Sequence, residues 1–141
     1  IERSGVAAMA LGMIERCLEL SLAYAKERVQ FGRPIGEFQL IQEKIARMEV
    51  ARMNVQNLVF RTLELAEAGK SMSLAEASAM KLYAARAADE VSQDAVQIFG
   101  GNGYMAEYRV EQFARDARVL RIYGGTDEIQ ISAIARDLLS R

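Results

Sequence analysis

Apolar residues recur every three or four positions along three long stretches of the chain, which is the spacing that places them on one face of a helix. The first stretch covers residues 2–29, with a stripe that runs from Val6 to Leu20. The second covers residues 37–68 and the third covers residues 73–99. The pattern therefore predicts three long helices.

The residues that punctuate these stretches predict where the helices begin and end. Pro34 follows the first stretch and disfavours helix at the residue before it, and Gly69 is a natural stop after the second. Ser73 and Glu76 have the spacing of a capping box at the start of the third. Shorter helices are predicted over residues 108–120 and after Thr126, which has the character of an N-cap.

No alternating pattern typical of a strand is visible, and no segment repeats. Ala, Leu, Met, Glu, Arg and Lys dominate the sequence, and these residues favour helix. Three long helices joined by short loops predict an all-α fold, an antiparallel helical bundle of the four-helix up-and-down type, with a shorter final helix.

The composition excludes several classes of function. A length of 141 residues suits one domain, and a net charge of −1 argues against a nucleic-acid-binding surface and against a basic membrane patch. No apolar run is long enough to span a bilayer. The chain has no His and one cysteine, Cys17, so we expect no metal site and no disulfide. We also expect no signal peptide and a reducing compartment, the cytoplasm or, in a eukaryote, the mitochondrial matrix.

Two corners rich in glycine stand close together near the end of the chain. Gln97–Tyr104 reads QIFGGNGY, and Tyr123–Glu128 reads YGGTDE. Each glycine costs backbone entropy, so these corners have two interpretations: tight turns between helices, or backbone that must pass close to a ligand. Spacing alone leaves both open.

Three segments in this order resemble the acyl-CoA dehydrogenase family. They are RVQFGRPIGEFQ at residues 28–39, QIFGGNGY at residues 97–104, and an Arg-Asp-Ala step that is followed by a terminal Gly-Thr turn. The resemblance covers nearly the whole chain. It implies the C-terminal helical domain (residues 1–141) of a longer enzyme whose N-terminal helical domain and middle β-domain are absent here.

The resemblance also implies a reaction. An acyl-CoA thioester loses its α-proton to a carboxylate while FAD takes a hydride from the β-carbon, and the product is a trans-2-enoyl-CoA. A homodimer or homotetramer and an electron-transferring flavoprotein are the implied partners. The isolated domain is expected to be folded but inactive.

Most members place the catalytic Glu in the final turn, where this chain has Gly124. A minority, like the isovaleryl-CoA and long-chain enzymes, place it on the first long helix immediately before an Arg, as in Glu2-Arg3. We therefore predict Glu2 as the base. From the residues alone, a solvated charged pair near a chain end is the favoured interpretation of Glu2 and Arg3, and the family resemblance reverses it.

Three further residues are predicted to contact the substrate. Arg3 resembles the family residue that lies near the thioester. Gly124 and Gly125 leave room that a Glu side chain would fill, which suits a branched or unusual acyl chain. The other interpretation is that the turn needs positive φ at these positions.

The resemblance assigns eleven residues to FAD. The guanidinium of Arg28 suits a pyrophosphate, although an Arg at a helix end also pairs with the last carbonyls. Thr126 suits both an N-cap and a ligand contact. In the family the first eight positions reach the FAD of a neighbouring subunit, and the last three lie beside the flavin. The eleven are Arg28, Phe31, Gln39, Gln97, Ile98, Phe99, Gly100, Gly101, Thr126, Asp127 and Glu128.

A second hypothesis belongs to a different class. Some relatives have lost the base and serve as structural or assembly modules in mixed oligomers. Glu2 argues against that function here, and its place at the chain end keeps the hypothesis open.

Overall fold

The computed structural model describes residues 2–141, with side chains from Arg3 onward. This part of the chain forms six α-helices and two short 3₁₀ turns. The helices are α1 (Glu2–Glu27), α2 (Gln39–Glu67), α3 (Leu74–Phe99), α4 (Gly101–Tyr104), α5 (Val110–Val119) and α6 (Asp127–Leu139).

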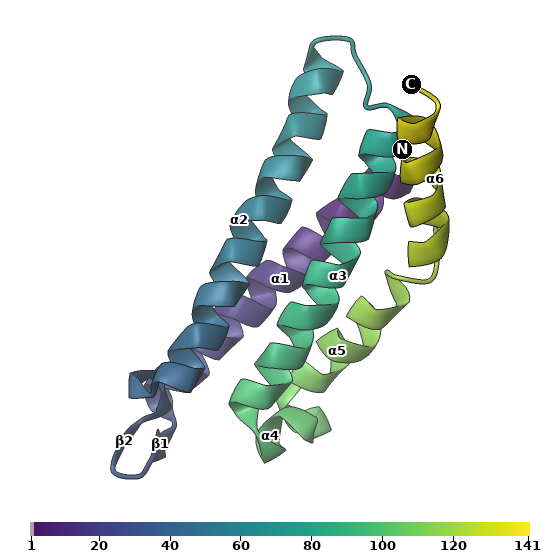
Figure 1. The fold of residues 1–141 in the computed structure, drawn as a ribbon. Helices are drawn as coiled ribbons and strands as arrows, with labels where there is room; N and C mark the ends of the chain where they lie inside the picture. The colour runs from purple at the N-terminus through teal and green to yellow at the C-terminus, as the bar shows by residue number, and fades with distance from the viewer. Residues whose placement is uncertain (1) are drawn as a thin grey trace.

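The long helices run antiparallel in chain order (Figure 1). α1 runs down, α2 up and α3 down, and α5 and α6 together return as a fourth, broken helix. α3 lies at the centre, because it packs against α1, α2, α5 and α6. The predicted all-α antiparallel bundle is confirmed. None of the described helices is both long and apolar enough to cross a bilayer.

The expectation of a chain without strands is wrong at one place. β1 (Val29–Gln30) and β2 (Arg33–Pro34) pair antiparallel and form a hairpin after α1. Phe31 and Gly32 form its tip with φ values of 54° and 80°. Strands of two residues are too short to show an alternating pattern, so the sequence carried no signal for them.

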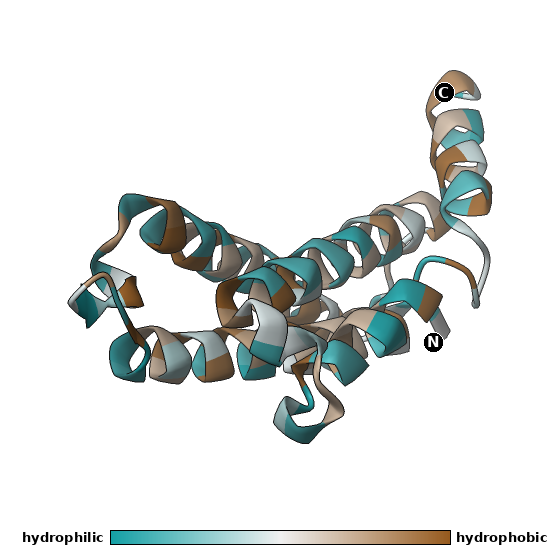
Figure 2. Ribbon diagram, turned by 90° about the horizontal axis from the view of Figure 1, so that it is seen from below, coloured by the Kyte–Doolittle hydropathy of each residue, from teal (hydrophilic) through white to brown (hydrophobic). Residues whose placement is uncertain are grey.

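Small side chains let the helices approach closely around α3. Ala84, Ala85, Ala88 and Ala95 are buried on it, and α1 contributes Ala7 and Ala10 in the same way. Hydrophobic and hydrophilic residues alternate along every long helix (Figure 2), as the predicted stripes require. Cys17 lies inside this core, where burial raises the pKa of its thiol to about 12.

The glycine corner after α3 is explained in part by packing. A Cβ at Gly103 would lie 2.8 Å from Cβ of Phe99, so any side chain there would force α4 away from α3. Gly100 and Gly101 are different, because nothing lies within 4 Å of a Cβ built at either position. Packing therefore accounts for Gly103, the positive φ of 59° accounts for Gly100, and only Gly101 of these three glycines has neither reason.

The turn between α5 and α6 needs glycine for its backbone. Gly124 has φ of 61° and Gly125 has φ of 87°. A Cβ at Gly125 would also lie 2.6 Å from Nε2 of Gln130. Thr126 then starts α6, and its hydroxyl accepts a hydrogen bond from the N–H of Ile129 at 3.3 Å. The predicted N-cap is confirmed.

The capping box of α3 gives a first test. Ser73 Oγ accepts from the N–H of Glu76 at 3.1 Å, and the Glu76 carboxylate accepts from the N–H of Ser73 at 2.8 Å. We expect Ser73→Ala to lower the free energy of unfolding by about 1 kcal/mol in urea denaturation. An unchanged midpoint would show that the cap does not stabilise the fold.

The same cap predicts a pH dependence. Hydrogen bonds with Ser73 lower the pKa of the Glu76 carboxyl below its ordinary value of 4.5. Glu76 therefore adds stability above pH 4.5, and this contribution is lost as the pH falls through the lowered folded-state pKa. Denaturation of the wild type and Glu76→Gln between pH 3 and 7 checks this. The difference in the free energy of unfolding between the two proteins should become smaller at acid pH. A difference that stays constant between pH 3 and 7 would contradict this prediction.

The α5–α6 turn gives a matched pair of substitutions. Gly125→Ala should destabilise the protein by about 1–3 kcal/mol, because it adds positive-φ strain and a clash with Gln130. Gly12→Ala is the control, since Gly12 is helical, exposed and has open space around it. It should stabilise the protein by about 0.5–1 kcal/mol. Equal effects in thermal or urea unfolding would contradict this account of the turn.

Candidate functional site

The start of α1 lies beside the turn between α5 and α6. Cγ2 of Val6 is 3.9 Å from the position of a Cβ built at Gly124 and is the only atom within 4 Å of it among the described residues. Gly124 therefore needs positive φ and also leaves space, so both interpretations of this glycine fit. α1 begins at Glu2, one turn before Val6. The side chain of Glu2, the predicted base, lies outside the described part of the chain.

Arg3 is half-buried in the same region. Its Nε is shielded from solvent and has no hydrogen-bond partner among the described residues. Its positive charge is close enough to lower the pKa of Lys81 on α3. The structure thus brings the predicted substrate residues Arg3, Gly124 and Gly125 to one place.

Two side chains bind the carbonyl groups of this turn from the inside. Lys81 is completely buried, and its Nζ donates to the carbonyl oxygen of Gly125 at 2.7 Å. Gln130 is also buried, and its Nε2 donates to the carbonyl oxygens of Gly124 at 3.1 Å and Gly125 at 2.9 Å. Burial lowers the pKa of Lys81, and the nearby Asp127 carboxylate opposes that shift.

The N–H groups of the turn, unlike its carbonyl groups, are not hydrogen-bonded among the described residues. Those of Gly124, Gly125 and Thr126 donate to no acceptor within residues 3–141. Successive unpaired N–H groups in a turn that contains left-handed residues form a concave donor surface for an anion or a carbonyl oxygen. The carbonyl groups of Gly124 and Gly125 are therefore hydrogen-bonded within the chain, whereas the N–H groups of the turn are available to a ligand.

Asp127 is placed inward, next to the turn. Its carboxylate pairs with Arg86 of α3 at 3.0 Å and with Arg121 of α5 at 2.9 Å. Arg121 pairs with Asp89 of α3 at 2.8 Å as well. Both ion pairs use Oδ2 of Asp127, and its buried Oδ1 has no hydrogen-bond partner among the described residues. Glu128 is exposed, and hydrogen bonds from its own backbone and from Thr126 lower the pKa of its carboxyl.

A second group of predicted residues gathers at the other end of the bundle. Arg28, at the end of α1, lines a hollow of about 320 Å³ together with Ile98, Phe99, Gly100 and Gly101. The ring of Tyr24 stacks on that of Phe99 with a centroid distance of 4.0 Å and forms a wall. This hollow joins the RVQFGRPIGEFQ segment to the QIFGG segment.

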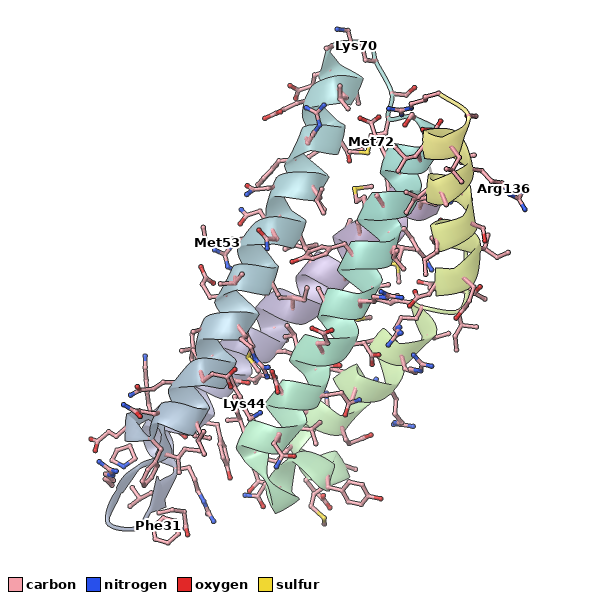
Figure 3. The ribbon with its side chains drawn as sticks, in the orientation of Figure 1. Phe31, Lys44, Met53, Lys70, Met72 and Arg136 are labelled. Atoms are coloured by element: carbon pink, nitrogen blue, oxygen red, sulfur yellow. The ribbon has the colours of Figure 1, made fainter. Side chains whose placement is uncertain are left out.

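Three residues predicted to bind FAD stay apart from this hollow. Phe31 is 92% exposed at the hairpin tip, where Figure 3 labels it. Gln39 and Gln97 are exposed and do not line the hollow. Within one chain, nothing covers these three side chains. Their assignment to the cofactor remains a prediction.

The two groups of residues are far from each other. α1 connects them, and the path from Arg3 to Glu27 along it is roughly 36 Å at the helical rise per residue. Most of the residues predicted to bind FAD therefore lie in two separate places on one chain, the hollow at Arg28 and the turn at Thr126.

Lys81 and Gln130 were missed as functional candidates. Lys81 stands on α3 three residues after Ser78 and four before Ala85, both buried. A lysine on a stripe of small buried residues was a usable signal. Gln130 carried no such signal, because a glutamine in a short helix is ordinary.

Comparisons with known proteins agree with this arrangement. Residues 1–139 match the family described as acyl-CoA dehydrogenase, C-terminal domain. The chain is 46% identical to an acyl-CoA dehydrogenase of Bacillus subtilis over 99% of its own length and 36% of that protein. It is 42% identical to a 3-(aryl)acrylate reductase of Clostridium sporogenes over 99% of this chain and 37% of that one.

A solved structure agrees as well. Butyryl-CoA dehydrogenase from Megasphaera elsdenii superposes with a TM-score of 0.92 at 42% identity, over 97% of this chain and 36% of that one. The chain thus spans little more than a third of the length of these relatives. On the match of family, sequence and structure, the chain belongs to the acyl-CoA dehydrogenase family and corresponds to its C-terminal domain.

Proposed function

We propose that this chain is the C-terminal domain of a longer FAD-dependent acyl-CoA dehydrogenase and supplies Glu2 as its catalytic base. The observation that supports the proposal is that the start of α1 lies beside the Gly124–Gly125 turn, since a Cβ built at Gly124 would lie 3.9 Å from Cγ2 of Val6. Position 2 and position 124 are the two places where the family puts the base. Because Val6, one turn after Glu2, lies beside Gly124, a carboxylate at position 2 would serve the same region as one at position 124.

The available N–H groups of the turn support the same chemistry. Donors aimed at a thioester carbonyl oxygen stabilise the negative charge that develops there when the α-proton leaves. Glu2 would take that proton, and a dry environment would raise its pKa toward the working range. Arg3, with its unpartnered Nε, would hold part of the thioester substrate.

The hollow at Arg28 fits the pyrophosphate and adenosine portions of FAD. It offers one guanidinium, which has no ion-pair partner among residues 3–141, and the open backbone of Gly100 and Gly101. Arginine donors match phosphate oxygens in pairs. At the second site, the turn between α5 and α6, Thr126 and Glu128 would lie beside the flavin ring. When bound, FAD supplies the two-electron oxidation.

The separation of the two sites, which lie at opposite ends of a path of roughly 36 Å along α1, supports an assembly of several copies. One FAD would be held at its flavin end by one chain and at its adenosine end by another. We therefore propose a homodimer or homotetramer. An acyl-CoA substrate, an electron-transferring flavoprotein and a cytoplasmic or mitochondrial location follow from the family. The space at Gly124 favours an acyl chain that is branched or bulky near the carbonyl.

The alternative is a catalytically silent assembly module. It would need the same fold and the same interface but no base. The two functions differ only in whether the protein oxidises an acyl-CoA. The test must therefore measure reduction of the bound flavin.

Glu2→Gln in the full-length protein is the central test. On anaerobic mixing with isovaleryl-, octanoyl- or palmitoyl-CoA, the wild-type flavin should bleach. The variant should keep FAD but bleach at least about a hundredfold more slowly, because a positioned base contributes roughly 10²–10⁴.

Glu15→Gln is the matched control, an exposed Glu on α1 far from the turn. It should bleach like the wild type. Equal bleaching in Glu2→Gln would place the base elsewhere. A wild type that binds FAD and never bleaches would favour the assembly module. Residues 1–141 alone should show no turnover.

Arg28→Gln tests the cofactor site. Loss of charge-assisted hydrogen bonds to a phosphate should weaken FAD binding roughly ten- to hundredfold. FAD retained after dialysis measures this, with Arg16→Gln as control, since Arg16 is exposed and pairs only with Glu19 on the same helix. Full retention in both variants would remove Arg28 from the cofactor site.

A further inference from the structure

We propose that Lys81 is a positioning residue for the dehydrogenation, because its ammonium holds the Gly125 carbonyl inward and keeps the N–H groups of the turn available to the substrate. The inference rests on the proposed function for its effect on the rate. The hold on the turn itself is independent of that function. Lys81 is not a catalytic residue, since it acts through the backbone.

Burial and one short hydrogen bond hold the side chain of Lys81 in a single position. It stands on α3, the central helix, and all of its surface is buried. Its Nζ has one acceptor among residues 3–141, the Gly125 oxygen at 2.7 Å. Movement of the turn away from α3 would leave a buried ammonium without any acceptor, which is strongly unfavourable.

The same bond changes the character of the turn. A cation bound to a carbonyl oxygen polarises that peptide group, and hydrogen bonds in a chain strengthen one another. The N–H that shares a peptide with the Gly125 carbonyl belongs to Thr126. That N–H is one of the three available donors. The amide of Gln130 acts in the same way on the peptide between Gly124 and Gly125.

A purely structural explanation fits the position poorly. The neighbours of Lys81 on its stripe are Ser78, Ala84 and Ala85, all buried. An apolar side chain would fill the space without desolvating a charge. Arg3 adds a second cation nearby, and only Asp127 compensates them among the groups that act on Lys81. A buried charge that costs stability and touches the substrate-facing turn is typical of a functional position.

The experiment uses the full-length protein and Lys81→Met, which keeps an unbranched side chain, shorter by one atom, and removes the charge. The control is Lys44→Met, because Lys44 pairs with Asp94 at 3.0 Å between α2 and α3, away from the turn (Figure 3). Two readouts are taken. One is the limiting rate of flavin bleaching at saturating acyl-CoA, and the other is hydrogen exchange of the peptide spanning residues 121–131.

We expect the limiting rate of Lys81→Met to fall about tenfold or more, with FAD still bound. Exchange at the amides of Asp127 and Gln130 should become faster, because the turn has lost its inner anchor. Lys44→Met should change neither. Lys81→Gln keeps a neutral hydrogen-bond donor. The amides of the turn should therefore exchange as in the wild type, and the limiting rate of flavin bleaching should lie between those of the wild type and Lys81→Met. This second variant tests the proposal if Lys81→Met does not fold.

Other outcomes overturn the proposal. A bleaching rate within twofold of the wild type, with unchanged exchange, would show that Lys81 positions nothing. Faster exchange across the whole protein with loss of FAD would show a role in folding alone. If the wild type itself never bleaches, the proposed dehydrogenation fails, while the exchange data still decide whether Lys81 holds the turn.

Discussion

Hydrogen bonds to two carbonyl groups fix the place where this chain differs most from an ordinary helical bundle. Lys81 and Gln130 reach the turn from the buried side and bind the oxygens of Gly124 and Gly125. The positive φ values at both glycines are therefore maintained from inside the protein. The N–H groups of the same turn have no acceptor among residues 3–141, and the turn lies beside the start of α1.

The fold was largely predictable because its signals are local. Helical spacing of apolar residues and the caps at Ser73 and Thr126 depend on neighbours in sequence, and both caps form as expected. Boundaries shifted by only a few residues. The hairpin was missed because its strands have two residues each, and α4 because a single helical turn shows no periodicity.

The candidate site was predictable only as far as its segments were distinctive. The family resemblance identified Arg28 and the QIFGG segment, and the structure brings them to one hollow. Spacing could not show that Lys81, more than forty residues before Gly125, would bind its carbonyl. Such a contact depends on how α3, α5 and α6 pack, and local sequence does not encode that packing directly.

The bond between α3 and the α5–α6 turn also has a consequence for the order of folding. Lys81 is synthesised more than forty residues before its acceptor at Gly125 and before the compensating charge of Asp127. Until these residues arrive, the ammonium must stay in water, because burying it without an acceptor is too unfavourable. The part of the core around Lys81 can therefore close only after the turn between α5 and α6 has been synthesised and has docked against α3.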